Sequence, residues 1–298
     1  MKKTFFYLLI FSFIVPEFAS AQYYNRNRYE WVFGLGATNF LGDVGGSNSI
    51  GTHFIKDFNW GAIREMGSVG MRYQLSDYMA VKGGLYLAMV RGNDAFTSEK
   101  FRENRNINFR SPIVEVSGQY EVYFNKQQIG HRYHIRHAHG LRSLNLQGYA
   151  FVGIGAFFFN PQGYYNGNWY NLRPLSTEGE GLPGGPKKYS QFGLCVPIGL
   201  GCKYALNRQW SIGLEISERW TTSDYIDDTS NKYYNNDAIL AAKGPIAAYF
   251  ADPSLGKVPG QTNTGQERGN PTHNDTYLFT MFTANYKIVY HRRTRSKF

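Results

Sequence analysis

The feature that most constrains the fold is an alternation of apolar with small or polar residues, which recurs eight times. Successive side chains of a β-strand point to opposite faces, so a period of two predicts strands. After residue 21, no apolar run reaches the roughly 18 residues that a transmembrane helix needs. The eight predicted strands lie within residues 31–37, 69–74, 81–89, 114–124, 152–158, 192–203, 210–219 and 283–288.

The residues that alternate with the apolar positions show whether the predicted strands form a soluble sheet or a membrane barrel. A soluble sheet exposes its charged face, whereas a membrane barrel turns apolar side chains to lipid and keeps the polar set in its lumen. In this sequence, the residues that alternate with the apolar ones are mostly Gly, Ser and Gln, with isolated charges of both signs. This composition suits a narrow lumen. We therefore predict a lumen charge network, paired across strands, of Arg72, Lys82, Glu115, Glu121, Lys203, Glu215, Arg219 and Lys287.

The connections between the predicted strands favour an outer-membrane barrel. Such barrels have short periplasmic turns and long extracellular loops, and six of the seven connections fit that alternation, the exception being residues 125–145. Aromatic residues, which favour the membrane interface, stand near the predicted periplasmic strand ends. They are Trp31, Tyr73, Tyr78, Phe124, Tyr149, Tyr204, Trp210 and Tyr290.

The predicted fold class is all-β: an eight-stranded antiparallel up-and-down transmembrane β-barrel with long extracellular loops. The 18% of charged residues and mean hydropathy of −0.42 disfavour a helical membrane bundle, and 17% aromatic residues disfavour a disordered chain. Side chains fill the interior of an eight-stranded barrel, so a diffusion porin is not expected. An anchor, a platform or a ligand site fits better.

The first 21 residues have the pattern of a secretory signal peptide. Lys2 and Lys3 precede an apolar run, and Ala19-Ser20-Ala21 provides small residues for cleavage. We predict a signal peptide over 1–21, an outer-membrane β-barrel over 22–290 and a basic periplasmic tail over 291–298. Export to the outer membrane of a Gram-negative bacterium makes lipid the expected surroundings and disfavours nucleic acid, despite the net charge of +10.

The two cysteines, Cys195 and Cys202, fall in one predicted strand. Seven residues of strand span about 23 Å, whereas a disulfide needs Cα atoms within about 7 Å. We expect free thiols, with Cys195 facing inward and Cys202 facing lipid.

The exceptional connection, residues 125–145, is basic and rich in histidine. Imidazoles could bind zinc, but no Cys and almost no carboxylate lies nearby, which favours a docking surface. The candidate partner-binding residues are Arg132, His134, Arg136, His137 and Arg142.

The segment from Thr221 to Asp237 concentrates carboxylates. Asp224, Asp227, Asp228 and Asp237 supply oxygen ligands of the kind that calcium prefers, but their spacing is not that of an EF-hand loop. Hydrogen bonding within local turns is the alternative.

No pattern in the sequence predicts an enzyme, a cofactor or a catalytic residue. His53 and His273 lie in predicted outer loops near Ser and Asp, but no spacing links them to a nucleophile.

Several strings resemble the PorG family of outer-membrane β-barrel proteins of the type IX secretion system. They are 40–46 (FLGDVGG), 109–115 (FRSPIVE), 172–191, 196–216 and 222–231. The resemblance extends from the first predicted strand to the seventh.

The resemblance implies a barrel that belongs to a protein secretion and gliding apparatus. It also implies contact with a periplasmic ring made of a lipoprotein and its partner, PorK/PorN-like. The basic connection 125–145 would face that ring. The alternative from another class is a generic outer-membrane anchor or adhesin whose extracellular loops bind a surface ligand.

Overall fold

A computed structural model describes residues 28–44, 60–97, 99–126 and 146–289, within one compact unit, Arg28–Val289. The predicted signal peptide (1–21) and basic tail (291–298) lie outside the described residues.

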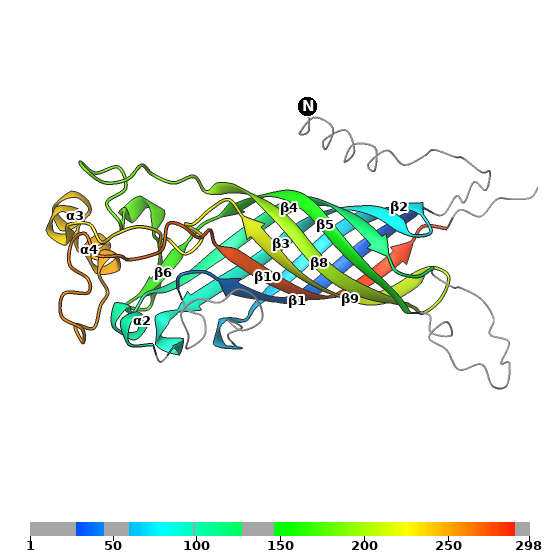
Figure 1. The fold of residues 1–298 in the computed structure, drawn as a ribbon, viewed down its shortest axis with the longest axis horizontal. Coiled ribbons are helices and arrows are strands. Elements are labelled where there is room, and N and C mark those ends of the chain that lie inside the picture. The colour runs from blue at the N-terminus through cyan, green and yellow to red at the C-terminus, as the bar shows by residue number, and fades with distance from the viewer. Residues whose placement is uncertain (1–27, 45–59, 98, 127–145, 290–298) are drawn as a thin grey trace, which may run out of the picture. The chain divides into compact units, whose positions relative to one another are not determined.

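Eight long antiparallel strands form a closed barrel (Figure 1). Each strand pairs with its sequence neighbours in the barrel, and the β1–β10 pairing joins the first to the last. This confirms the predicted eight-stranded up-and-down topology. The strands are β1 (Tyr29–Leu41), β2 (Arg64–Ser76), β3 (Met79–Asn93), β4 (Asn108–Tyr123), β5 (Leu146–Phe159), β8 (Phe192–Ala205), β9 (Trp210–Thr221) and β10 (Thr276–Lys287).

The two ends of the barrel differ in their connections. Short turns at 77–78 and 206–209 lie at the end where β1 begins and β10 finishes, and long loops occupy the other end. The helices and β6 gather at this long-loop end (Figure 1). The small elements there are α2 (Lys100–Arg105), α3 (Asn236–Lys243), α4 (Pro245–Ala251), the hairpin β6 (Gln162–Tyr165) and β7 (Asn168–Asn171), and 3-10 turns at Trp60–Ala62, Asp94–Phe96 and Arg173–Leu175.

The hairpin β6–β7 was not predicted from the sequence. Asn166 and Gly167 form its turn, and both have positive φ (46° and 82°). An Asn-Gly pair between aromatic residues is a strong hairpin signal, so the information was present in the sequence.

Side chains alternate between the outside and the lumen as predicted. On β4, Val114, Val116 and Val122 are exposed, whereas Glu115 and Glu121 are buried. An apolar exterior around a charged interior is the inverse of a soluble sheet and matches a membrane barrel. None of the helices in the described ranges is long and apolar enough to cross a membrane.

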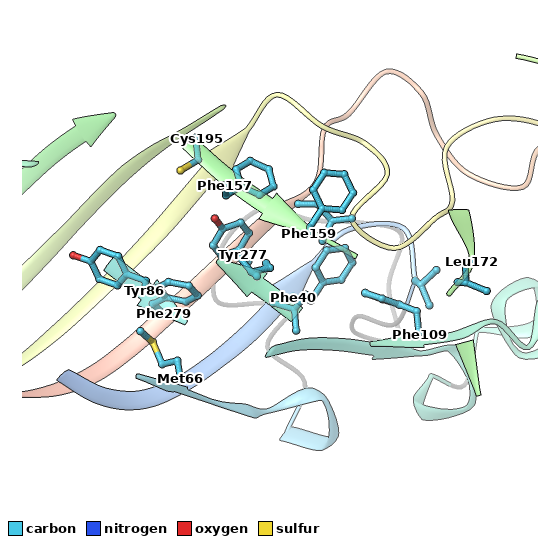
Figure 2. Close-up of a cluster of buried hydrophobic side chains, with 14 of the residues drawn as sticks. Phe40, Met66, Tyr86, Phe109, Phe157, Phe159, Leu172, Cys195, Tyr277 and Phe279 are labelled. Atoms are coloured by element: carbon cyan, nitrogen blue, oxygen red, sulfur yellow. The ribbon is translucent and has the colours of Figure 1, made fainter. Parts of the chain in front are cut away.

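Buried aromatic side chains fill the long-loop end of the lumen. Tyr86, Phe157, Tyr277 and Phe279 belong to a cluster that continues through Phe159 and Phe109 toward the loops (Figure 2). Tyr277 and Phe279 lie 5.1 Å apart between ring centroids. Much of the aromatic content therefore closes the lumen instead of facing lipid.

The predicted ring of aromatic residues at the short-turn end is largely present. Trp31, Tyr78, Phe124, Tyr204 and Trp210 are exposed, and Tyr73 is half-buried against Tyr29. The prediction was wrong for Tyr149, which is fully buried because it faces inward and hydrogen-bonds Glu215. Tyr290 lies outside the described residues.

Candidate functional site

Arg72 is the centre of a network of buried charges in the barrel lumen. Its guanidinium lies 2.7 Å from a carboxylate oxygen of Glu30, 2.7 Å from Glu121 and 3.5 Å from Glu215. These side chains come from β1, β2, β4 and β9, so the network ties opposite walls of the barrel together.

Two lysines extend the network. Lys82 lies 2.7 Å from Glu215 and 3.6 Å from Glu121, and Lys203 lies 3.2 Å from Glu30. Tyr149 and Tyr123 donate hydroxyl hydrogen bonds to Glu215 and Glu121, both at 2.5 Å. Every carboxylate of this layer thus faces cations or hydroxyl donors, which compensates for its removal from water.

A second ion pair lies closer to the long-loop end. Nε of Arg219 lies 3.3 Å from a carboxylate oxygen of Glu115, and its guanidinium carbon lies 3.9 Å from the ring centroid of Phe279. Tyr277 donates a hydrogen bond to the same carboxylate at 3.0 Å. This pair joins the charged layer to the aromatic cluster.

Seven of the eight predicted lumen residues meet in these two groups, and one does not. Lys287 is half-buried at the end of β10 and makes no ion pair with any described residue. Glu30 was missed because the recognised alternation began at Trp31, although Glu30 belongs to the same inward set as Val32. We call Glu30, Arg72, Lys82, Glu115, Glu121, Lys203, Glu215 and Arg219 the lumen network.

A glycine makes room for this packing. A Cβ on Gly201 would lie 2.4 Å from Cζ of Tyr149, closer than van der Waals contact allows. Gly201 pairs in register with Tyr149 on one side and with Glu215 on the other, so a residue without a side chain lets Tyr149 reach over β8 to Glu215.

The height of the apolar exterior identifies the surroundings of the barrel. Outward residues from Met79 to Met89 on β3 pair with those from Val122 to Pro112 on β4. Ten residue steps at about 3.4 Å, tilted by about 40°, cover roughly 26 Å along the barrel axis, which matches the apolar band of an outer-membrane barrel, about 25 Å. The chain is an outer-membrane β-barrel protein of a Gram-negative bacterium. Its short-turn end faces the periplasm, and its long loops are extracellular.

The described parts of the long loops form what we call the extracellular cap: 42–44, 60–63, 94–97, 99–107, 160–191 and 222–275. Arg268 binds Glu178 at 3.0 Å and donates to the backbone carbonyl of Asp228. Arg105 binds Asp94 at 2.8 Å and donates to the carbonyl of Asp43. The backbone N–H of Val44 donates to Asp227. The described part of the string 40–46, residues 40–44, therefore meets the strings 172–191 and 222–231 in the cap, although the three are far apart in sequence.

The cap buries more carboxyl groups than cations. Five buried carboxyls have no ion pair with a described residue: Glu180, Asp224, Asp227, Asp228 and Asp275.

Burial raises the pKa of these groups. It raises the pKa of Glu180 to about 8, with help from the charges of Asp228 and Glu178. It raises the pKa of Asp224 to about 7, and that of Asp228 to about 6 against the opposing charge of Arg268. Burial and neighbouring aspartates also raise the pKa of Asp227 and of Asp275. The cap therefore retains protons near neutral pH.

The structure places the four aspartates considered as calcium ligands in two different environments. Asp224, Asp227 and Asp228 are buried in the cap, whereas Asp237 is exposed in the first turn of α3. Asp227 accepts hydrogen bonds from the backbone of Val44 and Thr229. Across the described ranges, no three His, Cys, Asp or Glu side chains are arranged to hold a metal ion.

Both cysteines are free thiols. Cys195 is buried in the lumen, and Cys202 lines an apolar groove on the barrel exterior with Leu214 and Phe282. The positions agree with the inward and outward faces expected from the strand parity.

The candidate docking residues Arg132, His134, Arg136, His137 and Arg142 lie outside the described residues. Only residues 125 and 126 of this connection are described. Lys126 is exposed there and lies 2.9 Å from Asp77 in the first periplasmic turn.

No family model and no curated protein matches the sequence. Among solved structures, the chain is similar to the outer membrane protein OprG from Pseudomonas aeruginosa, at 10% identity and a TM-score of 0.36, over 89% of this chain and 98% of that one. It is also similar to Neisserial surface protein A, at 10% identity and a TM-score of 0.36, over 87% and 96%. The attachment invasion locus protein Ail of Yersinia pestis matches at 10% identity and a TM-score of 0.34, over 88% and 99%.

Proposed function

We propose that this protein is a non-enzymatic outer-membrane component of the type IX protein secretion and gliding machinery. In this role the barrel anchors or docks a periplasmic ring built from a lipoprotein and its partner, PorK/PorN-like. The proposal rests on the resemblance of the sequence strings to the PorG family, combined with the architecture of the lumen.

The filled lumen is the observation that carries the anchoring role. Arg72 and Arg219, two of the largest lumen side chains, are each at most 1% exposed, and the aromatic cluster fills the extracellular end. A lumen packed in this way leaves no path for a secreted protein. The barrel's contribution to secretion would then be to hold another component at the membrane.

The thiols support a non-enzymatic role. A nucleophile must reach its substrate, but Cys195 is buried and Cys202 faces the apolar exterior. We therefore propose that the protein acts by binding.

The basic connection 125–145 is the proposed docking surface, because it is the one large connection that leaves from the periplasmic end. Replacing Arg132 and Arg136 with Glu should abolish co-purification of the ring lipoprotein with the detergent-extracted barrel. The matched control reverses two exposed extracellular charges, Lys187→Glu and Lys188→Glu. Unchanged recovery of the ring with the Arg132/Arg136 variant would contradict the proposal.

The second candidate is an outer-membrane anchor or adhesin that binds a surface ligand. It is favoured by the cap, which has its own buried cluster of Ile239, Ala247 and Ala251 and so presents a folded extracellular surface. Deleting the gene separates the two functions. Loss of secretion and gliding supports the first, and intact secretion with altered adhesion supports the second.

A further inference from the structure

Two arginines stand directly opposite each other on the outside of the barrel. Arg91 on β3 pairs in register with Arg110 on β4, and both belong to the outward sets of their strands. Opposite residues of an antiparallel pair have Cβ atoms about 5 Å apart, where like charges repel. An anionic group bound beside this pair would meet a basic side chain from each of the two strands.

Arg91 and Arg110 lie at the level along the barrel axis where the apolar band of the exterior ends. Met89 and Pro112 are the last apolar outward pair toward the extracellular side, and Arg91 and Arg110 form the next outward pair. Asn93 and Asn108 follow, so the outward surface stays polar beyond this level. The arginines therefore lie at the depth of the lipid headgroups in the outer leaflet.

Neighbouring side chains hold Arg110 in place for binding. Its guanidinium carbon lies 4.0 Å from the ring centroid of Trp169, and its Nε donates to Gln162 at 2.8 Å. The two terminal nitrogens make no hydrogen bond to any described residue. A fixed guanidinium with free terminal N–H groups is suited to bidentate binding of a phosphate.

The extracellular hairpin adds aromatic surface beside the arginines. Tyr164 is 46% exposed and lies 5.2 Å from Trp169 between ring centroids. Such rings present an apolar face and a polar edge, a combination that suits the boundary between lipid and water. The C–H face of a sugar has a matching apolar surface.

We propose that Arg91 and Arg110, with Trp169 and Tyr164, bind the phosphate and the adjoining sugar of a phosphorylated glycolipid in the outer leaflet. The acyl chains of the same molecule would lie along the apolar exterior below, where Leu87 and Val114 are exposed. This position commits the site to a lipid and not to a soluble phosphate. The inference goes beyond the proposed secretion role and does not depend on it.

Binding of purified lipid A to the detergent-solubilised protein, measured by native mass spectrometry, tests the proposal. Changing both Arg91 and Arg110 to Ala should weaken binding by at least about tenfold, because two charge-assisted contacts are lost. Arg110→Lys keeps the charge but loses the planar fork, so it should give an intermediate loss even if the double variant folds poorly. Arg208→Ala, in an exposed periplasmic turn, is the matched control and should bind like the unaltered protein.

Two further ligands distinguish the sources of the phosphate. Lipid A stripped of its phosphates should bind at least about tenfold more weakly than the phosphorylated form, and millimolar inorganic phosphate should not displace the phosphorylated lipid. The proposal is overturned if both arginine variants bind as tightly as the unaltered protein, or if Arg208→Ala loses as much affinity as they do. Equal binding of the stripped lipid, or displacement by inorganic phosphate, would also overturn it.

Discussion

The barrel lumen and the extracellular cap both bury many ionisable side chains. The two regions differ in how the cost of removing these side chains from water is compensated. The lumen network contains four basic and four acidic residues, joined by ion pairs. The cap has two buried arginines, Arg105 and Arg268, each paired with one carboxylate, and leaves five buried carboxyls without an ion pair among the described residues.

Because of this difference, we expect the lumen to act as a rigid support and the cap to respond to pH. In the lumen, each buried charge lies against a charge of opposite sign, which compensates for its removal from water. Unpaired carboxyls in the cap have a raised pKa and are stabilised by protonation. We expect pH changes near neutrality to act on the cap and to leave the barrel intact.

The largest expected effect is the loss of one carboxylate from the lumen network. Glu215→Gln removes the charge that Lys82 contacts at 2.7 Å and that Arg72 faces at 3.5 Å. Breaking a buried pair leaves an uncompensated charge, so the free energy of unfolding should fall by about 3–5 kcal/mol. Urea titration of the barrel in detergent micelles measures this change.

Glu218→Gln is the matched control for that experiment. Glu218 lies on the same strand but faces outward and is half-buried. The same chemical change there should shift the free energy of unfolding by less than about 1 kcal/mol. Equal losses for the two variants would show that the lumen pairs do not support the barrel.

A smaller and more local effect is expected from pH in the cap. The folded pKa of Glu180 is raised from its ordinary value of 4.5 to about 8, so the folded cap binds the proton more tightly than the opened cap. The resulting stabilisation is complete below about pH 4.5 and is lost as the pH rises through about 8. Hydrogen-exchange protection factors for residues 224–231 should therefore drop by more than about tenfold between pH 5 and pH 9, while those of the strands stay constant.

Glu180→Gln sharpens the comparison, because a neutral amide cannot ionise. This variant should lose less protection at pH 9 than the unaltered protein, whereas Glu267→Gln, at an exposed site in the same cap, should behave like the unaltered protein. A cap whose protection is equal at pH 5 and pH 9 would contradict the assignment of protonated carboxyls.

The barrel was predictable from sequence because its rule is local. Each strand alternates between lipid and lumen, so the parity that placed Val114 outside also placed Glu115 and Glu121 inside. The inward position of Tyr149 was missed because an aromatic residue at a strand end suits both the interface and the lumen. Only the glycine opposite it, Gly201, indicates which side has room.

The cap was not predictable, because its contacts join loops that are far apart in the chain. Glu178 binds Arg268 and the backbone of Ser230 and Asn231, and no periodic pattern relates these positions. The hairpin at 162–171 is different, since Asn166-Gly167 marks its turn in the sequence. The arginine pair Arg91 and Arg110 needed the strand register, which the alternation alone does not fix.

The central claim is that side chains close the lumen, so that the barrel serves as a support and not as a channel. Single-channel recording of the purified protein in a planar lipid bilayer tests this most directly. The packed lumen network and the aromatic cluster predict no stable conductance at any moderate voltage. Reproducible, long-lived current steps from the folded barrel would contradict it.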